Sequence, residues 1–253
     1  MKETIQKNGY AIGTFFGMGN VPMMECISYT GLDFVVIDTE HGPYDTETVH
    51  NLISAAEKGG VIPIVRVGDV THKEIQRAAD GGARGIIIPC LKEREQFEEA
   101  VRLAKFAPLG DRGFIKGRGT GFGNEPWAMG SLSEYMKNSN DRLLLLPQCE
   151  TREALEKIEE IVKIEGIDGI FIGPFDLSIA LGIPGEFENP IFKESVRRIK
   201  EACHNEGKLC MTFTMDPAEA KESVKNGMDA VAVSIDSAVI KDAYTTLIAE
   251  VRS

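Results

Sequence analysis

The segment LLLLPQCETREALEKIEEIVK, residues 143–163, changes its pattern of apolar residues midway. Residues 143–150 form a nearly continuous apolar run, which is typical of a parallel strand buried on both faces. Residues 151–163 then begin with Thr151 as a helix N-cap and place apolar residues on one helical face, namely Ala154, Leu155, Ile158, Ile161 and Val162. The segment therefore predicts a strand followed directly by a helix.

The same unit recurs along the rest of the chain. Two further helical patterns, residues 189–207 and 216–227, open with Pro near the first turn and end in Gly. Seven other apolar runs have the length of strands, at residues 12–16, 34–38, 62–67, 85–89, 169–174, 208–213 and 230–235. Eight strands alternating with helices in 253 residues predict one (β/α)8 barrel domain over residues 1–253.

An open, doubly wound sheet is the alternative architecture. It would need a glycine-rich phosphate loop early in the chain, and two segments are candidates, residues 17–22 (GMGNVP) and 117–123 (GRGTGFG). The first lacks a third glycine, and the second does not connect a strand to a helix. Both therefore predict flexible loops. The phosphate site common after strands seven and eight of a barrel is not evident either.

Composition narrows the class of partner. The net charge of -11 and the pI of about 5.0 argue against nucleic acid or an anionic membrane surface, which call for a basic face. No apolar run approaches the roughly 20 residues that span a bilayer, and residues 1–10 do not resemble a signal peptide. The five cysteines form no CxxC pair, so we expect buried free thiols and a soluble, cytoplasmic protein.

Polar side chains gather where the predicted strands end, which is where barrel enzymes carry their chemistry. Gln148 and Glu150 share a strand face with Leu144 and Leu146, so we expect both to point inward at the rim of the barrel. The other polar residues at these strand ends are Asp38, Glu40, His41, Arg66 and Asp176.

Glu150 and Asp176 follow adjacent predicted strands, which lie about 5 Å apart. Two carboxylates so close repel each other unless a proton or a cation lies between them. Only oxygen ligands are present, which favours a hard divalent ion, Mg²⁺ or Mn²⁺. The structural alternative is that Glu150 caps the next helix and Asp176 caps the short turn at residues 177–181.

Arg66 and His41 complete the candidate site. Arg66 ends an apolar strand and suits bidentate binding of a carboxylate or an anionic oxygen, or else forms a structural ion pair with a neighbouring acid. His41 precedes a Gly-Pro turn, and beside three acids it predicts proton transfer rather than a turn hydrogen bond alone. His50, His72 and His204 predict solvated or capping roles.

No lysine ends a predicted strand, so a Schiff-base aldolase is not expected. If the barrel makes or breaks carbon–carbon bonds beside a carbonyl, a metal is the expected electron sink.

Five motifs resemble the HpcH/HpaI family of metal-dependent, pyruvate-specific class II aldolases, which includes 4-hydroxy-2-oxoheptanedioate and 2-dehydro-3-deoxyglucarate aldolases. The resemblance covers essentially the whole chain, and its most specific parts are the spaced Q-x-E-T and G-P-x-D-L-S pair. The motifs are DFVVIDTEHGPYD (33–45), IPIVRV (62–67), AADGGARGIIIPCL (78–91), PQCETREAL (147–155) and GIDGIFIGPFDLSIALG (166–182).

The resemblance implies a role for each site residue. Glu150 and Asp176 would ligate a divalent metal (Mg²⁺, Mn²⁺ or Co²⁺) that binds the keto and carboxylate oxygens of a 2-oxo acid. Arg66 would stabilise the enolate, and His41 would assist proton transfer to the aldehyde oxygen. The implied reaction splits a 4-hydroxy-2-oxo acid into pyruvate and an aldehyde. The remaining substrate-binding residues would be Gln148, Gly173, Pro174, Phe175 and Asp176.

The resemblance also pairs the histidine with an aspartate at Asp80. Asp80 precedes the fourth strand, so it lies at the wrong end of its own barrel. We hypothesise that Asp80 and the connection at residues 107–130, with Arg112 and Arg118, reach a neighbouring subunit's active site. The resemblance implies a homo-oligomer, a hexamer built as a trimer of dimers.

Two positions depart from the family pattern and leave the substrate open. Phe175 stands where members usually carry alanine, and Phe15 where some carry tryptophan. A citramalyl- or malyl-CoA lyase is an alternative function, but no basic site for the CoA phosphates is evident. A non-catalytic barrel that binds a metal and carboxylates is the alternative outside enzymes.

Overall fold

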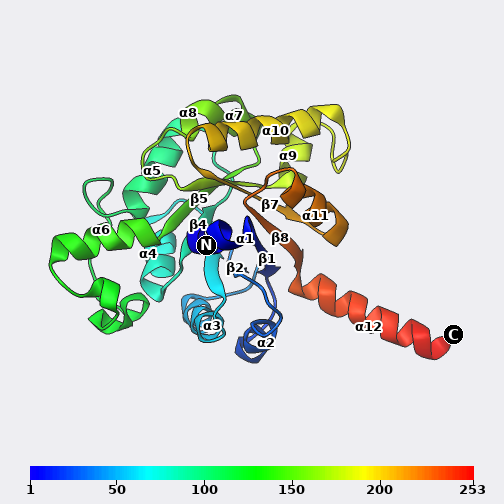
Figure 1. Ribbon diagram of the computed structural model, residues 1–253, viewed down its shortest axis with the longest axis horizontal. Coiled ribbons are helices and arrows are strands. Elements are labelled where there is room, and N and C mark those ends of the chain that lie inside the picture. Colours follow the sequence, from blue (N-terminus) through cyan, green and yellow to red (C-terminus); the bar gives the residue numbers. More distant parts are fainter.

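Eight parallel strands close into a barrel in the computed structural model, which describes residues 1–253 (Figure 1). The first strand pairs with both the second and the last, so the predicted barrel is confirmed and the open sheet is excluded. The strands are β1 (Ala11–Phe16), β2 (Phe34–Asp38), β3 (Ile62–Arg66), β4 (Gly85–Ile88), β5 (Leu144–Cys149), β6 (Gly169–Ile172), β7 (Leu209–Thr214) and β8 (Ala230–Ile235).

Helices surround the barrel, and local capping explains many of their starts. Thr151 caps α7 by accepting a hydrogen bond from the amide of Ala154, as predicted. The helices are α1 (Lys2–Asn8), α2 (Val21–Ile27), α3 (Thr46–Lys58), α4 (His72–Gly81), α5 (Arg94–Ala104), η1 (Arg118–Gly123), η2 (Pro126–Ala128), α6 (Leu132–Arg142), α7 (Arg152–Glu156), α8 (Ile158–Ile161), α9 (Pro174–Ala180), α10 (Pro190–Asn205), α11 (Pro217–Lys225) and α12 (Asp236–Arg252).

Two local predictions differ from the structure. The single helix expected over residues 151–163 is divided into α7 and α8, because Lys157 leaves helical geometry (φ -105°, ψ 13°). The loop expected at residues 117–123 contains the 3₁₀ helix η1, which is held by the Thr120 hydroxyl. That hydroxyl donates to the carbonyl of Gly117 and accepts from the amide of Gly123.

The core has two layers, because successive side chains of a strand point to opposite faces. Leu144, Leu146 and Phe171 belong to the cluster that fills the barrel. Leu145 and Cys149 belong to the larger cluster between the strands and the helices. This alternation confirms that the inward face of β5 leads to Gln148 and Glu150 at the rim.

The prediction that all cysteines are buried is wrong for two of them. Cys149, Cys203 and Cys210 are buried, but Cys26 and Cys90 are exposed, and all five are free. Cys26 lies on the short surface helix α2, and Cys90 follows β4 in a left-handed turn with φ of 61°. No helix combines the length and apolar character required to cross a membrane.

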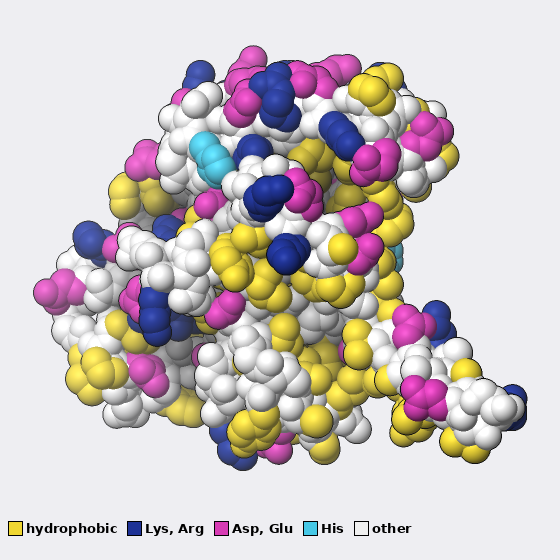
Figure 2. All heavy atoms as spheres, turned by 45° about the vertical axis from the view of Figure 1, so that its right-hand side comes forward, with side chains coloured by type: hydrophobic (Ala, Val, Ile, Leu, Met, Phe, Trp, Pro, Cys, Tyr) yellow, Lys and Arg dark blue, Asp and Glu magenta, His cyan; other side chains and the backbone are white.

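The last helix does not lie against the barrel. α12 begins where β8 ends and projects away from the body of the molecule (Figures 1 and 2). Only Asp236, at its start, is buried, where its carboxylate accepts hydrogen bonds from the amides of Gly17, Met18 and Gly19. Further along, the helix exposes Val239, Tyr244, Leu247, Ile248 and Val251.

Candidate active site

Arg66 is held in place by two acids at the C-terminal rim. The strand register sets Asp38 beside Arg66, and Asp38 is only 2% exposed. The Arg66 Nε and Nη2 atoms donate to Asp38 Oδ1 and Oδ2 at 2.9 and 2.7 Å, a bidentate pair. Nη1 lies 3.0 Å from Glu40 Oε2. Burial lowers the pKa of Arg66, but the hydrogen bonds and charge of Asp38 raise it more, so the guanidinium stays charged.

The predicted structural ion pair of Arg66 is therefore present, and it leaves the side chain at the rim. The guanidinium carbon lies 4.9 Å from the centre of the Phe15 ring, inside the mouth of the barrel. Arg66 also lines the rim cavity described below. Asp38 and Glu40 thus orient the Arg66 guanidinium toward that cavity.

His41 projects from the turn after β2. Its side chain is 71% exposed, and Nε2 lies 4.0 Å from Glu40 Oε2. A Cβ on the next residue, Gly42, would lie 2.1 Å from the Asp38 carbonyl oxygen, so the sharp turn requires glycine. The backbone is fixed while the imidazole remains free to meet a substrate.

Gln148 and Glu150 point into the rim from β5, as expected, and are 2% and 4% exposed. Glu150 Oε1 accepts the Cys90 amide at 2.6 Å, and Glu150 Oε2 accepts the Gln148 side-chain amide. Gln148 Oε1 is buried and has no partner. Thr151, not Glu150, caps the following helix, so the structural alternative for Glu150 is excluded.

Asp176 lies in the first turn of α9, on the neighbouring β6 side of the rim. Gly173 brings the two sides together, because a Cβ there would lie 2.7 Å from Glu150 Oε2. Burial raises the pKa of Glu150, the Cys90 amide opposes this, and the negative charges of Asp176 and Glu40 raise it further. Burial likewise raises the pKa of Glu40. The rim therefore concentrates negative charge.

These residues fit a divalent cation. A cation would relieve the repulsion that raises the pKa of Glu150, and the neighbouring Gln148, whose amide nitrogen donates to Glu150, has a buried side-chain oxygen without a partner. Nowhere do three or more His, Cys, Asp or Glu residues gather as a metal cluster. Two carboxylates suit Mg²⁺ or Mn²⁺, which retain water and accept substrate oxygens as further ligands.

A cavity of about 190 Å³ opens at this rim. One wall is aromatic: the Phe15 ring centre lies 5.9 Å from that of Phe171 and 5.2 Å from that of Phe213, and Phe175 is 6.2 Å from Phe213. No lysine is among the lining residues, which are Phe15, His41, Arg66, Gln148, Phe171, Gly173, Pro174, Phe175, Asp176, Phe213 and Ile235.

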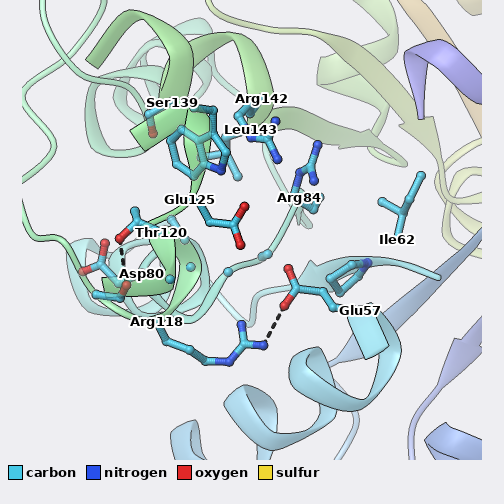
Figure 3. Close-up of a pocket in the computed structure, with 18 of the residues that line it drawn as sticks. Glu57, Ile62, Asp80, Arg84, Arg118, Thr120, Glu125, Ser139, Arg142 and Leu143 are labelled. Carbon is cyan, nitrogen blue, oxygen red and sulfur yellow. Dashed lines mark hydrogen bonds and ion pairs between the residues drawn. The ribbon is translucent and has the colours of Figure 1, made fainter. Parts of the chain in front are cut away.

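Asp80 does not join this group. It lies at the end of α4, before β4, whereas His41 follows the end of β2, so the two lie at opposite ends of the barrel. Asp80 Oδ1 accepts a hydrogen bond from Arg112 Nη2 at 2.8 Å, and Arg118 pairs with Glu57 at 2.6 Å (Figure 3). Within one chain, both arginines of the 107–130 connection are already engaged.

Sequence reasoning missed three contributors to the rim. The amide of Cys90 donates to Glu150, and only the left-handed turn at Cys90 hints at it. Phe171 and Phe213 face into the barrel, and counting alternate residues along β6 and β7 could have identified both.

Comparisons with known proteins identify the family. A family model described as HpcH/HpaI aldolase/citrate lyase matches residues 11–243. The 2-keto-3-deoxy-L-rhamnonate aldolase of Klebsiella pneumoniae subsp. pneumoniae is 32% identical over 257 residues, covering 100% of this chain and 92% of that protein.

Two solved structures are similar over the whole chain. The HpcH/HpaI aldolase of Desulfitobacterium hafniense DCB-2 has a TM-score of 0.91 at 29% identity, covering 100% of this chain and 96% of that one. The citrate synthase SbnG has a TM-score of 0.87 at 30% identity, covering 100% and 97%.

Proposed function

The chain belongs to the HpcH/HpaI aldolase/citrate lyase family and is a carbon–carbon lyase, and we propose that it is a pyruvate aldolase that acts on 4-hydroxy-2-oxo acids with a divalent metal bound at Glu150 and Asp176. The family generally depends on such a metal. The observation that carries the proposal is that Arg66 and Asp176 line one rim cavity without a lysine, while Glu150 lies close enough to Asp176 for the charge of Asp176 to raise its pKa.

Cleavage requires stabilisation of negative charge on the C2 oxygen when the C3–C4 bond breaks. A divalent cation at Glu150 and Asp176 would act as the Lewis acid for that charge. The Arg66 guanidinium, held by Asp38 and Glu40, presents a fixed positive charge to the same oxygen without having to reorganise. The C3 carbon then takes up a proton to give pyruvate.

The proton of the 4-hydroxyl must leave as the aldehyde forms. His41 lines the cavity and its Nε2 lies 4.0 Å from Glu40 Oε2, so we propose that the imidazole accepts this proton in cleavage and returns it in condensation. Gln148 orients Glu150 through its side-chain amide. The free backbone amides of Phe175 and Asp176, which follow Gly173 and Pro174 at the start of α9, would hold the substrate carboxylate.

One assay tests the function without knowledge of the natural aldehyde. In D₂O with Mg²⁺, Mn²⁺ or Co²⁺, the protein is expected to exchange the methyl protons of pyruvate, which proton NMR detects. Chelator should abolish the exchange, and borohydride should not trap the protein, because there is no lysine Schiff base. Condensation of pyruvate with short aldehydes should show the same metal dependence. If neither reaction occurs with any metal, a non-catalytic barrel is favoured instead.

The CoA lyase alternative is less well supported. Arg66 is the only arginine or lysine that lines the rim cavity, so no further cation is present there for the several phosphates of CoA.

Phe175 is expected to limit the size of the aldehyde. Its ring packs against Phe187 with centres 5.1 Å apart and narrows the rim cavity beside Phe213. Phe175→Ala should raise kcat/KM for longer aldehydes, relative to glycolaldehyde, by about tenfold, as expected for space gained in an apolar pocket. The KM for pyruvate should not change.

Phe187→Ala is the matched control for Phe175→Ala, because Phe187 contacts Phe175 but does not line the rim cavity. Aldehyde profiles are measured for both variants by following pyruvate consumption. The same shift in both variants, or in neither, would contradict a direct role for Phe175.

We further propose that the active enzyme is a homo-oligomer in which Asp80 meets His41 of another subunit. The exposed apolar side of α12 and an apolar groove on the barrel are surfaces that a subunit interface would bury. The groove has a volume of about 360 Å³ and is lined by Tyr10, Ile12, Pro217, Ala220, Lys221, Val224 and Val233.

Subunit mixing tests this arrangement. Asp80→Asn and His41→Asn should each lower kcat, and hybrids formed after reversible dissociation should recover activity, because one interface then carries both wild-type residues. Sedimentation must show hybrids of the same size as the wild-type oligomer. Hybrids no more active than the average of the parents, or full activity in a dilute monomer, would reject the shared site.

A further inference from the structure

A second cavity, of about 530 Å³, lies at the N-terminal end of the barrel, away from the rim site (Figure 3). Its walls come from the start of β4, the end of α6 and the connection that contains η1 and η2. This end of a barrel ordinarily serves stability, and the proposed aldolase chemistry uses none of its surface except Asp80. The volume lies within the range of small-molecule sites, roughly 300–1,000 Å³.

Four arginines line this cavity, and two of them are paired within the chain. Arg112 donates to Asp80 at 2.8 Å, and Arg118 pairs with Glu57 at 2.6 Å. Arg112 is itself 9% exposed, and its Nε atom has no hydrogen-bond partner. These contacts account for two of the three acids that line the cavity; Glu125 is the third.

Arg84 and Arg142 are not paired. Their Nε atoms are buried without any hydrogen-bond partner, and neither guanidinium forms an ion pair with a carboxylate. Both side chains point into the same part of the cavity (Figure 3). Glu125 projects toward the same space but does not come within ion-pair distance of either arginine.

Two neighbouring cations without a counter-ion are unfavourable in a partly buried site. Burial lowers the pKa of Arg142, the positive charge of Arg84 lowers it further, and the charges of Glu125, Glu3 and Glu57 offset this only in part. Both groups are nevertheless held in position. The backbone of Arg84 bonds to Pro63 and Leu144 at 2.8 and 3.0 Å, and the Arg142 guanidinium lies 4.7 Å from the centre of the Trp127 ring.

We propose that this cavity binds a small organic anion whose carboxylate or phosphate group lies between Arg84 and Arg142. Two guanidinium groups without a carboxylate partner offer several N–H donors, which suit the oxygens of either group. Trp127, Ile62 and Leu143 provide apolar surface for the body of the ligand. Neither Arg84 nor Arg142 belongs to the proposed metal site or aldolase site, although Asp80 lines the same cavity.

Isothermal titration tests the proposal with two probes, inorganic phosphate and citrate. The protein is treated with chelator so that no metal binds the probes, and ionic strength is held constant with chloride. Saturable binding to the wild type is expected, and Arg84→Gln or Arg142→Gln should each weaken it at least about tenfold, as expected for loss of a charged hydrogen bond. The tighter probe distinguishes a carboxylate site from a phosphate site.

Arg94→Gln is the matched control, because it removes the same charge from an exposed pair with Glu98 far from the cavity. It should bind the probes like the wild type. Without ligand, Arg84→Gln and Arg142→Gln should melt no lower than the wild type, since each relieves the repulsion.

The absence of saturable binding would overturn the proposal. Equal affinity in all variants would also overturn it, because the probes would then bind at the rim or non-specifically. A change of oligomer size in Arg84→Gln without anion binding would also overturn it, in favour of contact with an acidic surface of a second copy.

Discussion

Glu150→Gln is expected to abolish metal-dependent turnover, lowering kcat/KM by at least about 10³-fold, the upper end of the loss from a single charge-stabilising group. The substitution keeps the shape of the side chain and an oxygen that can accept the Cys90 amide, but it removes the negative charge next to Asp176. Metal affinity, measured by titration calorimetry, should fall together with pyruvate methyl exchange.

The pH dependence of metal binding provides a second readout for Glu150. Its pKa is raised by burial and by neighbouring acids, so in the metal-free protein the carboxyl takes up a proton at a higher pH than a free glutamate. A cation must displace that proton, so wild-type affinity should fall as pH decreases through this raised pKa.

The exposed Glu98, which pairs with Arg94, supplies the control Glu98→Gln, and this variant should bind metal and turn over like the wild type. If Glu150→Gln retained wild-type metal affinity, the metal would have to lie elsewhere, and the role proposed for Glu150 and Asp176 would be wrong.

Arg66→Ala is expected to lower kcat by roughly 10²-fold or more while sparing metal affinity, because it removes a charge that faces the developing oxyanion. It should also lower stability. Asp38 and Glu40 would lose their counter-ion, and breaking a buried pair costs about 3–5 kcal/mol. Activity and thermal unfolding must therefore be measured together.

Arg66→Lys separates the catalytic effect from the structural one. Lysine keeps a positive charge for Asp38 but cannot make the bidentate contact of the guanidinium. We expect most of the stability to return while kcat remains at least about tenfold low. If Arg66→Lys recovered kcat as fully as it recovered stability, Arg66 would be only a structural partner of Asp38.

The site residues that could be predicted are those whose position follows from strand ends. His41, Arg66, Gln148 and Glu150 each end or follow an apolar run, and parallel strands bring such ends to one rim. Their partners could not be predicted in the same way. The clamp of Arg66 by Asp38 depends on the register between β2 and β3, which neither strand encodes alone.

The sequence by itself determined the barrel and which polar residues end its strands, because apolar periodicity and turn residues act over short distances along the chain. Only the tertiary structure decided that Arg84 and Arg142 share a cavity in which neither forms an ion pair, and that α12 leaves the barrel with its apolar side exposed. Arg84 and Arg142 lie 58 positions apart in the chain. Contacts between residues so far apart in the chain depend on how the closed barrel and its long connections pack in three dimensions.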